Sequence, residues 1–266
     1  MPDPVIPRPA STLLLLRDGA DGIEVLMTAR HEEAGFAAGA LVFPGGKLDT
    51  ADAELRPFCA DAPAHNDKAL DDTALGFRIT AIRETFEECG ILLARHKGAA
   101  ALLSAAELGE LRRRHQEAAD TTRFAALVAA AGLELATDTL VPFAHWITPR
   151  DRPKRFDTHF FAAPAPADQV AVHDGREAVE TVWAKPAATV EAGDRGAAKL
   201  VFATRMNLVK LARSRSVAEA LAAASREPIV TVCPEIVRSP AGPAIRIPEE
   251  AGYGLTEMLV GNMPRA

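Results

Sequence analysis

The chain has 266 residues, with 30 basic against 36 acidic side chains and a formal net charge of −6. This length suits one large or two small domains and is long enough to bury a substantial core. The acidic balance excludes a typical nucleic-acid-binding protein, which needs a basic face to hold phosphates. No apolar run approaches the ~18 residues of a membrane span, and the N-terminus lacks the basic start of a signal peptide.

The cysteine pattern indicates the redox environment of the protein. Cys59, Cys89 and Cys233 are odd in number, far apart and in no CxxC pair. This pattern excludes a disulfide framework or a thiolate zinc site. It favours a reducing, cytoplasmic location.

The first quarter of the chain predicts strands followed by an insertion. Residues 11–17 and 23–29 are apolar runs separated by the turn-rich DGADG, which predicts a hairpin. Residues 39–43 predict a third short strand, which ends at the turn-forming sequence Pro-Gly-Gly. Residues 49–74 are polar and acidic without a clear period, and they predict an inserted loop.

Helices and strands then alternate. Residues 75–96 predict a helix, because one stripe at helical spacing is apolar: Ile79, Ile82, Phe86, Cys89 and Leu93. Further helices are predicted at 104–118, 121–131, 195–213 and from Ser216, and strands at 140–147, 156–163, 179–184, 228–237 and 244–248. Capping-box residues mark two helix starts, namely Ser104 with Glu107 and Ser216 with Glu219. We expect an α/β (α+β type) fold with a mixed sheet between helices, as one domain over 1–266 with a helical insertion at about 100–135.

The predicted helix at 75–96 carries three carboxylates on one face. Glu84, Glu87 and Glu88 stand at i, i+3 and i+4, nearly opposite the apolar stripe. Only Glu87 has a cation one turn away, Arg83, so something external would offset the repulsion. A hard divalent cation such as Mg²⁺ fits best, since carboxylates and phosphates are its usual ligands. The alternative is an ordinary solvated glutamate face.

Two segments together resemble a known signature. Residues 83–91 read RETFEECGI, and upstream lies FPGGKLD at 43–49. They resemble the Nudix hydrolase family, whose signature is Gly-x5-Glu-x7-Arg-Glu-U-x-Glu-Glu-x-Gly-U with U aliphatic. The second half matches except at Thr85, which stands at a U position. In the first half Asp52 stands where the family has Glu, and 30 residues rather than seven separate it from Arg83.

This interruption, at about 53–75, puts the family's usual pairing of its signature Arg in doubt. Arg83 could pair with Asp49, Asp52 or Glu87. The resemblance implies a Nudix α/β/α sandwich that hydrolyses a nucleoside diphosphate linked to another group, using Mg²⁺ or Mn²⁺. The chemistry is sound, because metal ions polarise a phosphoryl oxygen and activate water while a carboxylate takes the proton.

Carried over by position, the resemblance also implies roles for single residues. The implied metal ligands are Glu84, Glu87, Glu88 and the carbonyl of Gly46, or of its neighbour Gly45. The implied catalytic groups are Arg83, Glu87 and Glu88, with Glu87 either a ligand or the base. Glu177 and Glu180 are alternative bases, because they resemble a late acidic strand motif; both could equally be a solvated strand edge.

Other segments resemble the coenzyme A and acyl-CoA diphosphatases within that family. They are LMTARHEEAGFAAGALVFPGG at 26–46, RITAIRETFEECGILL at 78–93, and the later WITP and KRFDTHFF. The substrate is anionic, so we expect binding by Gly45 and by cations drawn from Arg30, Arg150, Arg152, Lys154 and Arg155. The basic turn at 150–155 could instead be solvated. Trp146 and Phe156 would stack an adenine or lie in the core, and His159 is expected to be packed and hydrogen-bonded.

Three functions stay open from the sequence. The first is metal-dependent hydrolysis of CoA or acyl-CoA to 3′,5′-ADP and 4′-phosphopantetheine. The second is hydrolysis of ADP-ribose, NADH or another nucleotide sugar. The third is a sensor that binds a nucleotide without cleaving it, although the three glutamates argue against this. All take a small nucleotide and need neither nucleic acid nor membrane, and the alanine-rich helices would suit a homodimer interface or a substrate lid.

Overall fold

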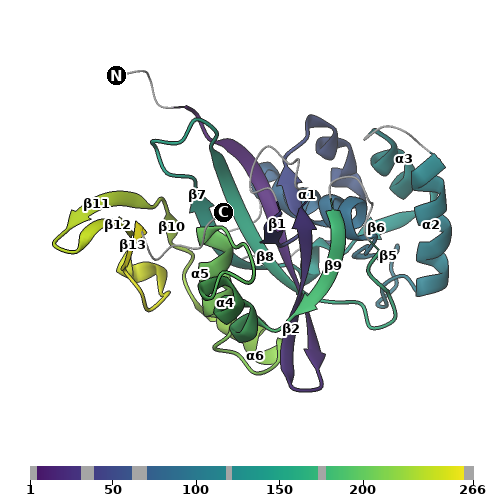
Figure 1. Cartoon of the computed structure of the whole chain (residues 1–266). Helices are drawn as coiled ribbons and strands as arrows, with labels where there is room; N and C mark the ends of the chain where they lie inside the picture. Colours follow the sequence, from purple (N-terminus) through teal and green to yellow (C-terminus); the bar gives the residue numbers. More distant parts are fainter. Residues whose placement is uncertain (1–4, 31–38, 62–70, 118–121, 173–177, 261–266) are drawn as a thin grey trace.

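The computed structural model describes residues 5–30, 39–61, 71–117, 122–172 and 178–260. A mixed sheet runs through its centre, with helices on both faces (Figure 1). The strands of this sheet are β1 (Arg8–Gly19), β2 (Gly22–Arg30), β3 (Leu41–Val42), β4 (Gly45–Lys47), β7 (Val141–Ile147), β8 (Phe156–Pro164), β9 (Ala178–Ala184) and β10 (Thr231–Val232). Smaller sheets join β5 (Ala94–His96) to β6 (Leu133–Leu135), and β11 (Glu235–Ser239) to β12 (Gly242–Arg246) and β13 (Glu257–Leu259).

Strand β1 organises the sheet, because it changes partner along its length. It pairs in parallel with β8 on one side along most of its length. On the other side its first half pairs with β4 and its second half with β2, both antiparallel. The glutamate-bearing helix contacts both β1 and β4.

The helices pack on the two faces of the sheet as two apolar clusters. They are α1 (Asp72–Cys89), α2 (Ala105–Glu117), α3 (Thr122–Ala130), α4 (Pro186–Asp194), α5 (Phe202–Leu211) and α6 (Val217–Arg226), with 3₁₀ helices η1 (Thr50–Phe58), η2 (Thr137–Thr139) and η3 (Glu249–Ala251). Leu13 and Leu15 of β1 face α1, α2 and α3. Leu14 and Leu16 face α5 and α6. This alternation buries both faces, as the continuous apolar run of β1 requires.

The predicted mixed sheet and most predicted elements are confirmed. The hairpin of β1 and β2, the strands β7 to β9 and the capped helices α2 and α6 lie close to their predicted ranges. Ser104 and Glu107 form the predicted capping box, with a 2.6 Å bond between their side chains. The single-domain assignment stays a prediction. Of the predicted insertion at 53–75, residues 62–70 lie outside the described residues, and the described part holds the end of η1 and the first residues of α1.

Three predicted boundaries were wrong. The helix predicted at 75–96 ends at Cys89, because Gly90 adopts a left-handed conformation with φ of 66° and the chain then becomes extended. The helix predicted at 195–213 covers only α5, Phe202–Leu211, because a turn at Gly196 precedes it, and α4 before this turn was not predicted. The strand predicted at 39–43 covers only Leu41–Val42, and the Gly-Gly pair after it starts strand β4.

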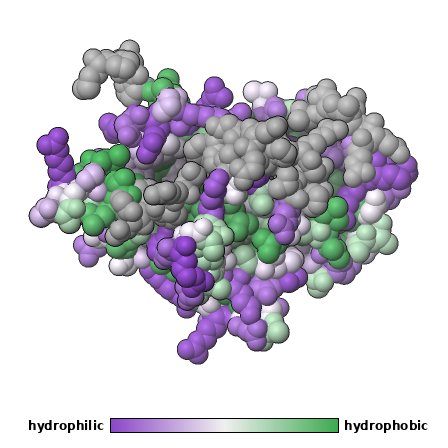
Figure 2. Space-filling model, in the orientation of Figure 1, coloured by the Kyte–Doolittle hydropathy of each residue, from purple (hydrophilic) through white to green (hydrophobic). Residues whose placement is uncertain are grey.

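The surface is largely hydrophilic in the face shown by Figure 2. Apolar side chains gather at its left, over the C-terminal strands, where Ile236 of β11 is half exposed. None of the described helices combines the length and hydropathy that crossing a membrane requires.

Candidate functional site

Arg83, near the middle of α1, holds the carboxylates of the predicted site together. Its Nε donates to Asp52 at 2.7 Å, and its Nη1 donates to Glu84 and to Glu87 at 2.8 Å each. Its Nη2 also donates to the carbonyl of Lys47 at 3.1 Å. Burial alone would lower the pKa of Arg83, but its hydrogen bond to Asp52 and the neighbouring negative charges raise it above its usual value. The guanidinium is therefore a permanent cation inside the site.

The partner of Arg83 left open by the sequence is resolved in favour of Asp52, with Glu84 and Glu87 as further partners. Asp52 lies in the first turn of η1, where its side chain accepts from the backbone N–H of Asp49. It is buried and also accepts a 2.7 Å bond from the hydroxyl of Thr80. Sequence reasoning missed Thr80, although its position one turn before Arg83 on the same helix face was a usable signal.

The glycine pair brings backbone up to the glutamates. Gly45 and Gly46 lie in β4, opposite Thr12 and Ser11 of β1. The N–H of Gly45 donates to Oε2 of Glu88 at 3.1 Å. A Cβ at Gly46 would collide with the carboxylate of Glu84, so only glycine allows this approach.

The alternative of an ordinary solvated glutamate face does not match the structure. Glu88 is 6% exposed, and Thr80 and Arg83 on the same helix are also buried. Strand β4 and η1 cover the face that the apolar stripe leaves open, which is why α1 is buried nearly all round. Buried carboxylates need a compensating cation, and Arg83 supplies one positive charge here.

The donor set fits a hard divalent cation. Glu84, Glu87 and Glu88 are oxygen ligands, and the backbone of Gly45 and Gly46 lies beside them. Their oxygens do not form a tight cluster among the described residues. Glu84 and Glu87 are drawn to Arg83, and Glu88 to Gly45. A cation with more charge than one guanidinium would draw them together.

The predicted substrate-binding cations are spread over two places. Arg30 ends β2, and its Nε is buried with no hydrogen-bond partner among the described residues. Arg150, Arg152 and Lys154 lie on the exposed turn between β7 and β8, with Lys154 over the ring of Phe156. Arg155 is buried, and its guanidinium donates to the carbonyls of Thr148 and Val5. The side chain of Arg155 therefore has a structural role.

Of the two alternative bases, the structure describes only Glu180, and it is not brought to the glutamates. Glu177 lies outside the described residues. Glu180 is opposite Ala29, whereas its neighbour Thr181 is opposite Thr28. Leu26 of β2 packs on the α1 side, so alternation along β2 and β9 sends Glu180 to the other face. Glu180 therefore does not share a face with the glutamates of α1.

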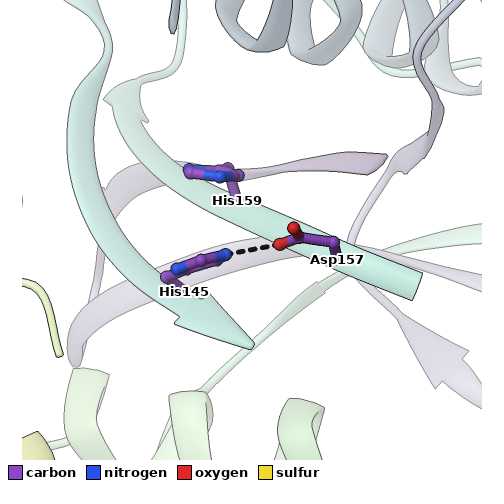
Figure 3. Close-up of side chains that lie close together, drawn as sticks. All are labelled: His145, Asp157 and His159. Carbon is purple, nitrogen blue, oxygen red and sulfur yellow. Dashed lines mark hydrogen bonds and ion pairs between the residues drawn. The ribbon is translucent and has the colours of Figure 1, made fainter. Parts of the chain in front are cut away.

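Trp146 and His159 are both packed against other side chains. Trp146 is buried and donates to the hydroxyl of Tyr253 at 2.8 Å, so it belongs to the core rather than to an adenine site. His159 is packed as expected, stacked between Phe77 and His145. Sequence reasoning missed that His145 and Asp157 join it (Figure 3). Their alternate spacing on two neighbouring strands was the available signal.

Three comparisons with known proteins agree with this geometry. Residues 53–200 match the family model of the NUDT19 Nudix domain. The acyl-coenzyme A diphosphatase NUDT19 of Gallus gallus is 33% identical over 215 residues, covering 63% of this chain and 55% of that protein. The protein of the same name from Homo sapiens is 31% identical over 213 residues, covering 65% and 56%. The chain thus spans about half the length of these curated relatives.

A solved structure supports the fold independently. The crystal structure of a NUDIX hydrolase from Alicyclobacillus acidocaldarius superposes with a TM-score of 0.70 at 29% identity. The superposition covers 82% of this chain and 96% of that one. The family match covers more than half of the chain and includes Arg83 and its three glutamates. The chain therefore belongs to the Nudix hydrolases, in the family of the NUDT19 Nudix domain.

Proposed function

We propose that this protein is a metal-dependent diphosphatase that hydrolyses CoA or acyl-CoA to 3′,5′-ADP and 4′-phosphopantetheine or its acyl derivative. The observation that carries the proposal is the position of three glutamates on one helix face, where Glu84 and Glu87 bind the buried Arg83 and Glu88 accepts from Gly45 of the glycine strand. The names of the relatives from Gallus gallus and Homo sapiens support the choice of substrate.

The residues of α1 would divide the work. Glu84, Glu88 and the carbonyl of Gly46 would hold Mg²⁺ or Mn²⁺, which when bound supplies charge for the diphosphate and lowers the pKa of water. Arg83 orients two of the three glutamates, and the N–H of Gly45 orients the third. Glu87, whose side chain is 20% exposed, is the most accessible of the set and is our candidate base.

In the hydrolysis, the oxygen of a water adds to one phosphorus and the bond from that phosphorus to the bridging oxygen breaks. The bridging oxygen stays on the other phosphate, and the base takes the proton of the water. Arg30 would contact the anionic substrate, because its buried Nε has no partner in the described part of the chain.

A substrate panel with one variant tests the proposal. Purified protein with Mg²⁺ should cleave CoA or acyl-CoA in preference to ADP-ribose and NADH, as resolved by chromatography of the products. Glu88→Gln should lower kcat by ~100-fold or more, since it removes a metal-binding charge while keeping the side-chain shape. The matched control is Glu110→Gln on the exposed face of α2, where Glu110 pairs with Arg113 and Arg114.

Each other outcome has a clear meaning. A kinetic preference for ADP-ribose or NADH over CoA would contradict the proposed substrate. Activity that survives unchanged in Glu88→Gln would contradict the assignment of the glutamates. Tight binding of a nucleotide without turnover of any substrate would indicate a sensor.

A further inference from the structure

A second group of ligand-type side chains lies on the sheet, apart from the glutamates of α1. His145 of β7 is directly opposite His159 of β8, and Asp157 precedes His159 by two residues. Alternation therefore sends all three side chains to one face of the sheet. Phe77 of α1 stacks on His159, so this is the face that α1 covers. Figure 3 shows the two imidazoles one above the other, with the carboxylate beside them.

The donor atoms of these three residues converge. One ligand atom from each lies within 4.8 Å of the other two. Nε2 of His145 is 2.5 Å from Oδ1 of Asp157, and the two imidazole rings stack with centroids 4.1 Å apart. Among the described residues, no other group of three histidine, cysteine or carboxylate side chains brings its ligand atoms this close together.

We propose that His145, Asp157 and His159 bind a zinc-type divalent transition-metal ion. Two imidazoles and one carboxylate are a ligand set that zinc accepts, with a fourth position left for water or an anionic ligand. Imidazole favours zinc, copper and nickel over magnesium. The site thus differs in chemistry from the all-oxygen set of Glu84, Glu87 and Glu88.

The surroundings hold the ligands in a form that can bind. Nδ1 of His145 is 2.8 Å from the hydroxyl of Thr231, which fixes the ring and leaves Nε2 facing Asp157. Among the described residues, Asp157 forms its ion pair with His145 and not with a lysine or an arginine. The ring of His159 is held between Phe77 and His145, with centroids 3.9 Å and 4.1 Å away, which fixes its orientation beside the other two ligands.

Metal binding would require a small rearrangement. Donors that each lie ~2.1 Å from a tetrahedral ion are about 3.4 Å apart. The ion would therefore replace the contact between His145 and Asp157, moving that pair apart by about 1 Å and tilting the imidazoles out of their stack. All three residues are only half-buried, which leaves room for this movement.

The two sites are neighbours without sharing ligands. His159 is opposite Ser11 of β1, and Ser11 is opposite Gly46 of β4. His159 and Gly46 are thus two strands apart, or about 10 Å at the usual spacing between strands. Variants of one site can therefore be made without touching a ligand of the other.

Titration of the full chain with Zn²⁺ by calorimetry, and with Co²⁺ by visible absorption, tests the proposal. After treatment with a chelator, the wild type should bind one ion that gives Co²⁺ the absorption of a four-coordinate site. Asp157→Asn and His159→Gln should each weaken this binding by about 100-fold. Asp157→Asn is the safer variant for folding, because its side chain is 35% exposed.

Two controls make the result specific. Glu88→Gln should keep the Co²⁺ signal, because it alters only the glutamate site. His96→Gln should also keep it, since His96 forms an exposed pair with Glu107 that has the same chemistry without a third ligand. Absence of binding to the wild type, undiminished binding in both Asp157→Asn and His159→Gln, or loss of the signal in His96→Gln would each overturn the proposal.

Discussion

Asp52 holds Arg83, the side chain that binds Glu84 and Glu87. It and Arg83 are both buried, at 4% and 5% side-chain exposure, and they form a two-atom contact. Asp52→Asn should lower the free energy of unfolding by about 2–4 kcal/mol, because it weakens a buried ion pair whose arginine keeps other partners. Urea unfolding measures this.

Asp52→Glu is the matched variant. It keeps the charge and should retain more stability than Asp52→Asn. Equal loss in the two variants would show that shape rather than charge matters at this position. Asp61→Asn, at an exposed position, serves as the control.

Gly46 gives a second prediction for a single residue. Gly46→Ala should push the Glu84 carboxylate aside and lower kcat by about 100-fold, the usual cost of displacing a catalytic group by ~1 Å. Steady-state kinetics on the preferred substrate measure it. Gly109→Ala in α2 is the control, because a Cβ there meets nothing within 4 Å. Gly109→Ala should leave kcat unchanged and raise stability by about 0.5–1 kcal/mol.

The sequence predicted the three glutamates of the site but not all the contacts that hold them in place. Spacing on one helix brought Glu84, Glu87 and Glu88 together, since helical neighbours are local. Asp52 was one of three open partners for Arg83. The bond from Gly45 to Glu88 could not be predicted, because it depends on β4 pairing with β1, more than 30 residues away in sequence.

Among the elements, predictions succeeded where the signal was local. Capping side chains placed the starts of α2 and α6, and alternation placed β7 and β8. The helix predicted at 195–213 was right only for α5, because the chain turns at Gly196 before α5 begins, and the helix that starts at Pro186 was missed. The end of α1 was misplaced because Leu93 continues the apolar stripe from an extended segment.

The start of α2 predicts a pH effect. Glu107 accepts from the hydroxyl and the backbone N–H of Ser104, which, together with His96, lowers its pKa to about 2. Because the unfolded chain binds more protons between pH 4.5 and 2, this stabilisation is present above pH 4.5 and is lost as the pH falls through that window. Glu107→Gln should therefore flatten the fall in stability between pH 5 and pH 3, as measured by urea unfolding at both values. Glu54→Gln, at an exposed position, should leave the fall unchanged.

For the protein as a whole, a buried polar chain ties the C-terminal part to the sheet. Trp146 of β7 donates to Tyr253, which donates to Asn207 of α5 at 2.8 Å. Tyr253 and Asn207 lie beyond the 53–200 match, so the family comparison does not cover this contact.

Tyr253→Phe should lower the free energy of unfolding by about 2–3 kcal/mol, because it leaves two buried polar groups without a partner. Chemical denaturation monitored by tryptophan fluorescence measures this. A change below about 0.5 kcal/mol, typical of a surface substitution, would mean that the C-terminal segment does not depend on this contact.

The pairing of Asp52 with Arg83 also bears on how this signature is found in other chains. The 30 residues between them, in place of seven, add only about 1 kcal/mol of loop-closure entropy, because that cost grows with the logarithm of length. The chain can therefore be lengthened at this point while the ion pair and the glutamates stay in contact. A search that requires a fixed number of residues between the two halves would pass over this protein, whereas one that scores the two halves separately would find it.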